Sequence, residues 1–240
     1  MMKHALALIA LSTLIGCQPG PKAEASSHEE ASNPGKLAEQ PLQTPLSTQV
    51  KDLAPWKKDV SWTYSLDFMQ QEPGKQREST QAEMTMSVNQ LDGEKATIEV
   101  KNPADRELIV WQATDKGIVQ VEAKDGKSKF DPPMPLVPAT LKAGEEVIWK
   151  GTGQRVDSTV GPFEVRVKVL GEEEVDTNMG RMKAWSIESK AAWQIDGKPI
   201  LSETRTWWSP GVGMVRMTRE MIGPEYARML VLRLKSHTVK

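Results

Sequence analysis

Apolar and polar residues alternate along most of the chain beyond residue 55. From Trp62 to Phe68 every second residue is large and apolar, and the residues between them are polar. This period of two is typical of a strand with one buried face. Alternation or a short apolar run recurs at residues 62–68, 82–88, 96–100, 108–111, 118–121, 147–149, 163–169, 182–187, 192–195, 204–207, 214–217 and 229–234. With Asp-Gly turn signals between several segments, the pattern predicts an all-β fold, a single antiparallel meander forming a strongly curved sheet or a partly open barrel.

The apolar positions of these segments are rich in tryptophan and methionine, and the chain has 8 Trp and 12 Met. A curved sheet lined with such side chains can close as a packed core, which is the base expectation. It can also leave a groove for an apolar ligand, because methionine adapts to irregular shapes and is common at promiscuous binding surfaces. Both interpretations stay open at this point.

One segment, residues 130–138, breaks the alternation with four prolines. Proline lacks the backbone donor that a central strand needs. We therefore expect an ordered extended crossover between two halves of one sheet, with Phe130, Met134 and Leu136 packed on the core. The alternative is a polyproline-type docking segment.

The N-terminus carries a second kind of pattern, an apolar run over residues 5–15 that follows Lys3. This run is shorter than the roughly 20 apolar residues of a transmembrane helix, but it fits the apolar region of a signal peptide. It ends in Leu14-Ile15-Gly16-Cys17, where Cys17 is the only cysteine of the chain. This tetrapeptide resembles a bacterial lipobox.

The lipobox resemblance implies that a peptidase cleaves between Gly16 and Cys17 and that Cys17 receives a diacylglyceryl group, with a further acyl chain such as palmitate on its amino group. Several acyl chains on one residue are enough for stable membrane anchoring. Gln18 after the cysteine, in place of aspartate, favours the outer membrane of a host with two membranes, facing the periplasm.

Residues 18–54 contain no aromatic residue and several prolines, so they bury too little apolar surface to fold. The predicted organisation is therefore a lipoprotein signal peptide at 1–16, a lipid-anchored disordered tether at 17–54 and an antiparallel β domain at 55–240. His28 lies in the tether beside two glutamates and is expected to be solvated.

Composition and charge exclude several classes of function. The chain has 31 basic and 32 acidic residues, so it lacks the basic excess of a nucleic-acid-binding protein. Beyond residue 16 only His28 and His237 remain, which argues against a Ser-His-Asp triad and against common zinc sites. No metal, other cofactor or catalytic residue is expected. The densest carboxylates, at residues 145–146 and 172–174, leave a carboxylate-dependent hydrolase of cell-envelope sugars as the alternative.

The sequence WWSPGVGMVR at residues 207–216 is the most distinctive motif of the second half. It predicts a tight turn in which Pro210 sets φ, Gly211 accepts a positive φ and Gly213 allows close backbone approach. Because neighbouring strand residues point to opposite faces, we expect one of Trp207 and Trp208 in the core. The other is expected to face outward or to lie against the turn, with a structural role or a role in binding.

This motif, together with Pro135-Leu136 and residues 141–149, resembles the poorly characterised TapB-like family of exported bacterial β domains over roughly residues 130–235. The resemblance implies a β fold at the cell envelope and no established catalytic residues. Together these features predict a non-enzymatic, membrane-tethered envelope lipoprotein whose β domain binds a protein partner or an apolar ligand.

Overall fold

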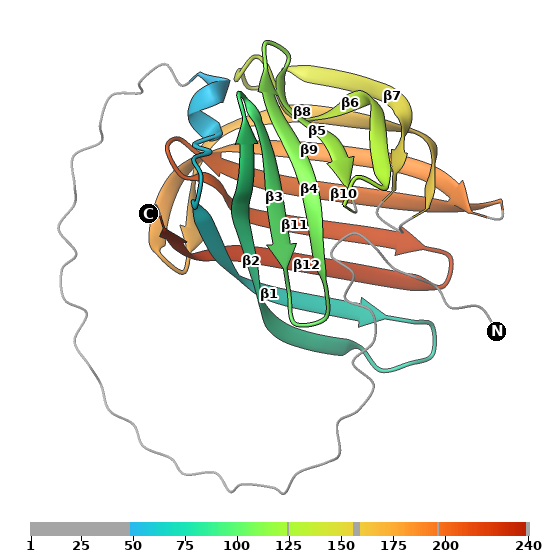
Figure 1. Ribbon diagram of the computed structural model, residues 1–240. Helices are drawn as coiled ribbons and strands as arrows, with labels where there is room; N and C mark the ends of the chain where they lie inside the picture. The colour runs from blue at the N-terminus through green and yellow to red at the C-terminus, as the bar shows by residue number, and fades with distance from the viewer. Residues whose placement is uncertain (1–48, 124, 156–158, 196, 239–240) are drawn as a thin grey trace, which may run out of the picture. The chain divides into compact units, whose positions relative to one another are not determined.

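The computed structural model describes residues 49–123, 125–155, 159–195 and 197–238. These residues form a closed antiparallel barrel of twelve strands (Figure 1). The strands are β1 (Ser61–Gln71), β2 (Glu78–Asp92), β3 (Lys95–Lys101), β4 (Arg106–Thr114), β5 (Gly117–Ala123), β6 (Ser128–Pro138), β7 (Glu146–Gln154), β8 (Val160–Thr177), β9 (Gly180–Ile195), β10 (Lys198–Ser209), β11 (Gly213–Gly223) and β12 (Tyr226–Thr238), and the 3-10 helix η1 (Val50–Leu53) precedes them.

Each strand pairs with its neighbours in the sequence, and β1 pairs with β12 to close the barrel. In the closing pair Leu66 lies opposite Leu232. The predicted all-β meander is thus confirmed. The sequence predicted a strongly curved sheet or a partly open barrel, and the β1–β12 pair closes the barrel completely. The twelve predicted segments lie in eleven of the strands, because residues 182–187 and 192–195 both belong to β9. Strand β6 contains none of them.

The core lies inside the barrel, on the face that the alternation marks as apolar. On β1 the inward residues Trp62, Tyr64 and Leu66 are at most 4% exposed. On the outward face Asp67 pairs with Arg233 of β12. Tryptophans and methionines occupy the interior as predicted. The main apolar cluster includes Met84, Met86, Trp111, Trp208, Met214 and Met217.

Strand β6 corrects the interpretation of the proline-rich segment. Residues 128–138 form a strand paired with β5, in which even Pro135 and Pro138 lie opposite β5 residues. Toward β7, however, only Asp131 and Thr152 are paired. The prolines therefore do not prevent a strand from forming, although its pairing toward β7 is sparse. Phe130 is buried, and Met134 and Leu136 pack on the core as expected.

Side chains hold the β6–β7 junction where backbone pairing is sparse. Trp149 of β7 donates its indole N–H to the Pro132 carbonyl at 3.0 Å, and its ring packs against Phe130 and Phe163. A Cβ at Gly153 would lie 2.3 Å from the Phe130 ring. Glycine at this position thus lets β6 approach β7 closely.

One end of the barrel is closed by η1 and the turn between β10 and β11 (Figure 1). Leu53 of η1 is fully buried, and the Gly211 N–H bonds to the Asp52 carbonyl at 2.8 Å. The packed structure thus includes residues 50–54, which the sequence interpretation assigned to the tether, because Leu53 lies in the core and Val50 and Ala54 pack against it. The signal peptide and the rest of the tether lie outside the described residues and stay predictions.

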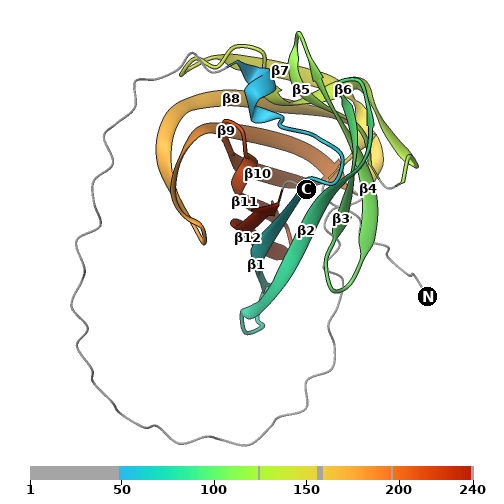
Figure 2. The ribbon, with the colours of Figure 1, turned by 60° about the vertical axis from the view of Figure 1, so that its left-hand side comes forward.

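The hairpin of β8 and β9 extends past its neighbours and curves beside β10–β12 (Figure 2). The bend coincides with a bulge at Gly171, whose φ of +133° favours glycine. At the hairpin turn the Asn178 N–H bonds to the Leu234 carbonyl of β12 at 2.9 Å. The hairpin tip is thereby fixed to a strand two positions beyond β10 in the barrel order.

Candidate ligand-binding cavity

The interior of the barrel contains a cavity of about 170 Å³ that is partly open to solvent. Most of its wall is apolar, including Met84 and Met86 of β2, Trp111 of β4 and Trp208 of β10. An apolar wall with a few polar groups is the usual construction of a small-molecule site. The lumen is therefore a packed core that contains a cavity. It has features of both interpretations that the sequence left open, a packed core and a groove for an apolar ligand.

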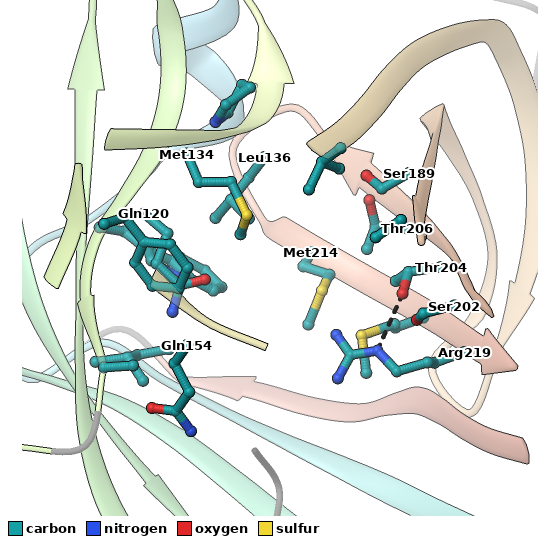
Figure 3. A pocket seen from close by; sticks show the side chains of 18 of the residues that line it. Gln120, Met134, Leu136, Gln154, Ser189, Ser202, Thr204, Thr206, Met214 and Arg219 are labelled. Carbon is teal, nitrogen blue, oxygen red and sulfur yellow. Dashed lines mark hydrogen bonds between the residues drawn. The ribbon is translucent and has the colours of Figure 1, made fainter. Parts of the chain in front are cut away.

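One side of the cavity carries a column of hydroxyl groups. Ser202, Thr204 and Thr206 occupy successive inward positions of β10, and Ser189 of β9 lies beside them. Figure 3 shows these side chains on one side of the cavity and Gln120 and Gln154 on the other. We call Ser189, Ser202, Thr204, Thr206 and Arg219 the polar wall.

Arg219 of β11 is the cation of this wall. Its side chain lines the cavity and is half-buried. Its Nε donates to Thr204 Oγ1 at 3.0 Å, the dashed contact in Figure 3. Burial lowers the pKa of Arg219 to about 10, and the charge of Glu107, which lines the same cavity, opposes that shift. Arg219 therefore remains charged at neutral pH.

Sequence reasoning missed the polar wall. Its signal is present in Thr204-Arg205-Thr206-Trp207-Trp208, where two faces alternate, but each face combines polar side chains with a tryptophan, so neither is marked as the inside. Arg219 follows the alternation of β11, which suggests an inward position, although its charge alone predicts exposure. Only the closed barrel decides which face is inside.

Trp207 and Trp208 point to opposite faces, as predicted, but both are buried, at 7% and 2% exposure. Trp208 faces the cavity, packs against Trp111 with ring centroids 5.6 Å apart and donates its N–H to Thr206 Oγ1. Trp207 faces outward but is covered by other side chains. The curved hairpin explains why.

Trp207 lies on the outward face of β10, where side chains from three strands cover it. Its indole N–H bonds to Glu173 Oε1 of β8 at 2.5 Å. The guanidinium groups of Arg205 and Arg216 lie 4.8 and 5.0 Å from its ring centroid, and Arg205 pairs with Glu173 at 2.6 Å. We call this cluster the hairpin latch, because it ties β8 to the outside of β10.

The motif around Pro210 has a structural role. Val212 N–H bonds to the Ser209 carbonyl across the turn, and Gly211 has φ +73° as predicted. Gly213 has φ +95°, while a Cβ there would meet only ordinary contacts at 3.6 Å. Conformation thus explains this glycine better than the close approach that we expected. Trp62 and Tyr64 donate to the carbonyls of Val212 and Met214, which fixes the turn to β1.

The remaining predicted sites divide into two groups. Gly16, Cys17 and His28 lie outside the described residues. The carboxylates of the hydrolase alternative contact cations where contacts are described: Glu146 pairs with Arg166, Glu173 with Arg205 and Glu174 with Arg181. His237 stacks on Trp62 at a centroid distance of 5.6 Å.

The described part of the chain contains no group of three or more His, Cys, Asp or Glu side chains placed to hold a metal ion. It also contains no helix long and apolar enough to cross a membrane.

Among known proteins, no family model matches the chain, and no curated protein matches it significantly. The TapB-like resemblance therefore stays a prediction.

Solved structures with a comparable arrangement include a candidate lipoprotein from Parabacteroides distasonis, with 11% identity, 76% of this chain and 96% of that chain covered, and a TM-score of 0.41. An exported protein with a YmcC-like fold from Bacteroides fragilis has 10% identity, coverage of 76% and 97%, and a TM-score of 0.36. The hypothetical lipoprotein YmcC from Escherichia coli has 8% identity, coverage of 77% and 89%, and a TM-score of 0.39. Likeness at this level carries no argument about function.

Proposed function

We propose that this chain is a non-enzymatic envelope lipoprotein whose barrel binds an apolar ligand in its lumen. The observation that carries the proposal is the cavity of about 170 Å³ with a predominantly apolar wall. A well-packed interior has few voids larger than a water molecule, so a hollow of this size needs a reason. An occupant would supply the contacts that the wall lacks.

The proposal includes a lipid anchor on Cys17, which would hold the barrel at the membrane, in the outer membrane facing the periplasm. The lipobox supports this part. Replacing Cys17 by Ala is expected to leave the chain unprocessed or soluble. Normal membrane fractionation of that variant would contradict the anchor, and co-sedimentation of the native protein with inner-membrane markers would contradict the outer-membrane assignment.

Binding in the lumen can be tested with the neutral fluorescent probe N-phenyl-1-naphthylamine and residues 18–240, the expected mature chain without its lipidated cysteine. Ala191 of β9 lines the cavity, whereas Ala192 beside it is exposed on the outer face. The probe should brighten with the unmodified chain and with Ala192→Phe, and the signal should be lost with Ala191→Phe, which fills the cavity. Absence of brightening, or equal brightening with both variants, would refute binding in the lumen.

The second class of function, a hydrolase acting through carboxylates, gains no support from the described contacts. A glycosidase needs two carboxyl groups facing one another across a cleft. Glu107 is the one carboxylate among the described residues that line the cavity.

A further inference from the structure

Arg219 is the one cation among the described residues that line the cavity. An arginine is rarely placed inside an apolar interior unless it is paired, because a buried charge without a close partner is destabilising. Positions that break such a rule without an evident structural gain are expected at functional sites. The position of Arg219 therefore indicates a functional role.

The hydrogen bonding of Arg219 leaves one end of its guanidinium available. Nε is engaged by Thr204 Oγ1 at 3.0 Å. Thr204 is the one hydrogen-bond partner described for the guanidinium. The two terminal nitrogens form a planar fork, which matches the two oxygens of a carboxylate or phosphate. Thr204 thus orients the fork toward the cavity and leaves it ready for an anion.

Glu107 acts on Arg219 through its charge. It lines the same cavity, and its charge raises the pKa of Arg219. Glu107 therefore competes with a bound anion for the charge of Arg219. An anion that contacts Arg219 directly gains most from that charge, because attraction rises as the separation falls.

The volume of the cavity limits the apolar part of the ligand. A buried apolar cavity of about 150 Å³ accepts a benzene molecule, and pockets for drug-sized ligands have about 300–1,000 Å³. The hollow of about 170 Å³ thus holds a ring or a short alkyl chain in its present form. The methionines of its wall, which are flexible, allow some adaptation to longer chains.

We propose that Arg219 binds the anionic head group, a carboxylate or a phosphate monoester, of a small amphiphile whose apolar part lies among the tryptophans and methionines of the lumen. This inference rests on the proposed function, since it names the class of ligand for the same cavity. The neighbouring hydroxyl groups of Ser202 and Thr206 supply donors for the oxygens that Arg219 does not reach.

The test compares three probes with the same tail: octanoate, octyl phosphate and the uncharged octan-1-ol. Each is titrated into residues 18–240 and detected by displacement of N-phenyl-1-naphthylamine. At least one of the two anions should bind about tenfold tighter than the alcohol, a factor equal to about 1.4 kcal/mol. Tighter binding of octanoate identifies a carboxylate head, and tighter binding of octyl phosphate identifies a phosphate head.

Variants of both charged residues give opposite expected signs. Arg219→Met should abolish the preference for the anions and leave binding of the alcohol unchanged or tighter. Glu107→Gln should strengthen binding of the anions, because it removes the competing negative charge. Arg166→Met, which changes an outer-face arginine of β8 that is 55% exposed, is the control and should behave as the unmodified chain.

The outcomes separate this inference from the function on which it rests. Equal affinity for all three probes, or an anion preference that survives Arg219→Met, overturns the role of Arg219 while binding in the lumen stands. Failure of all three probes to bind, together with no response to N-phenyl-1-naphthylamine, overturns both. A weaker anion affinity in Glu107→Gln also contradicts the inference, and it does not depend on the folding of the Arg219 variant.

Discussion

Strands β1 and β10 lie in the same barrel and show the same alternation, yet their inward faces differ. On β1 the inward residues are Trp62, Tyr64, Leu66 and Phe68, and we call this face the filled wall. On β10 the inward residues before Trp208 are Ser202, Thr204 and Thr206, part of the polar wall. The filled wall has side chains large enough to fill its share of the lumen, whereas the short side chains of the polar wall leave space.

The difference separates residues that hold the fold from residues available for function. The aromatic donors Trp62 and Tyr64 on the filled wall bond to the carbonyls of Val212 and Met214 and so help to close the end of the barrel. The polar wall instead exposes hydroxyl groups and a guanidinium to a cavity. If this division is correct, substitutions on the two walls should affect stability and binding in opposite proportion.

The largest expected effect is a loss of stability on the filled wall. Leu66 is fully buried, so Leu66→Ala should lower the free energy of unfolding by about 2–5 kcal/mol. Ser202→Ala on the polar wall is the matched control and should change it by less than about 0.5 kcal/mol, because it removes little volume beside an existing cavity. Urea denaturation of both variants measures this. Similar losses for both would contradict the division.

The next largest loss of stability is expected in the hairpin latch, on the outward face of β10. Trp207→Ala should lower the free energy of unfolding by about 3 kcal/mol, at the lower end for Trp→Ala, because part of its contact is with two arginines. Hydrogen exchange measured by mass spectrometry should rise in residues 172–184 and stay unchanged in β1. Unchanged exchange in the hairpin would mean that Trp207 does not hold it.

A smaller effect of opposite sign is expected at Arg219. Because burial disfavours its charge, Arg219→Met should leave the free energy of unfolding unchanged or raise it by about 1 kcal/mol. Thermal and urea unfolding at neutral pH give the value. A loss of more than about 1 kcal/mol would assign Arg219 to the structure of the barrel and weaken the case for a binding role.

The smallest expected effect concerns His237, which stacks on Trp62 of the filled wall. Burial lowers the pKa of His237 below 6.5. The unfolded chain then binds the proton more readily, so this contribution to stability is present above about pH 6.5 and is lost as the pH falls. His237→Phe keeps the ring but does not titrate.

The free energy of unfolding of His237→Phe minus that of the unmodified chain should therefore increase as the pH falls from about 7.5 to about 5.5. The change should be small because the imidazole is only partly buried. A difference that is independent of pH, or one that decreases, would contradict the burial of a neutral histidine. Denaturation at several pH values in one buffer series provides the measurement.

The sequence predicted the filled wall better than the polar wall, and the reason is physical. On β1 the period-two pattern identifies the inward face, because apolar residues occupy only one side. On β10 the two faces carry Thr204, Thr206 and Trp208 or Arg205 and Trp207, and neither composition marks the inside. Trp207 is buried by a hairpin that reaches it from β8, which depends on long-range geometry that local alternation does not contain.

Strand β6 also differs from what its sequence predicts, because it contains four prolines and still forms a strand. Four prolines in residues 130–138 led to the expectation of a crossover, but pairing with β5 is retained while pairing with β7 is almost lost. A proline removes only its own backbone donor, so a strand with several prolines can still pair with a neighbour. The close packing of Phe130 against Gly153 then depends on side chains.

The central claim is that the polar wall and the hollow beside it bind an amphiphile, and the most direct measurement is a crystal structure of residues 18–240 grown with 8-bromo-octanoate. Anomalous scattering locates the bromine independently of the rest of the ligand. We expect a bromine peak inside the lumen near Met86 and Trp208, with the carboxylate oxygens on the terminal nitrogens of Arg219. Bromine peaks only on the outer surface, for example beside the exposed residues Leu201 and Ile222, or no peak at all, would contradict it.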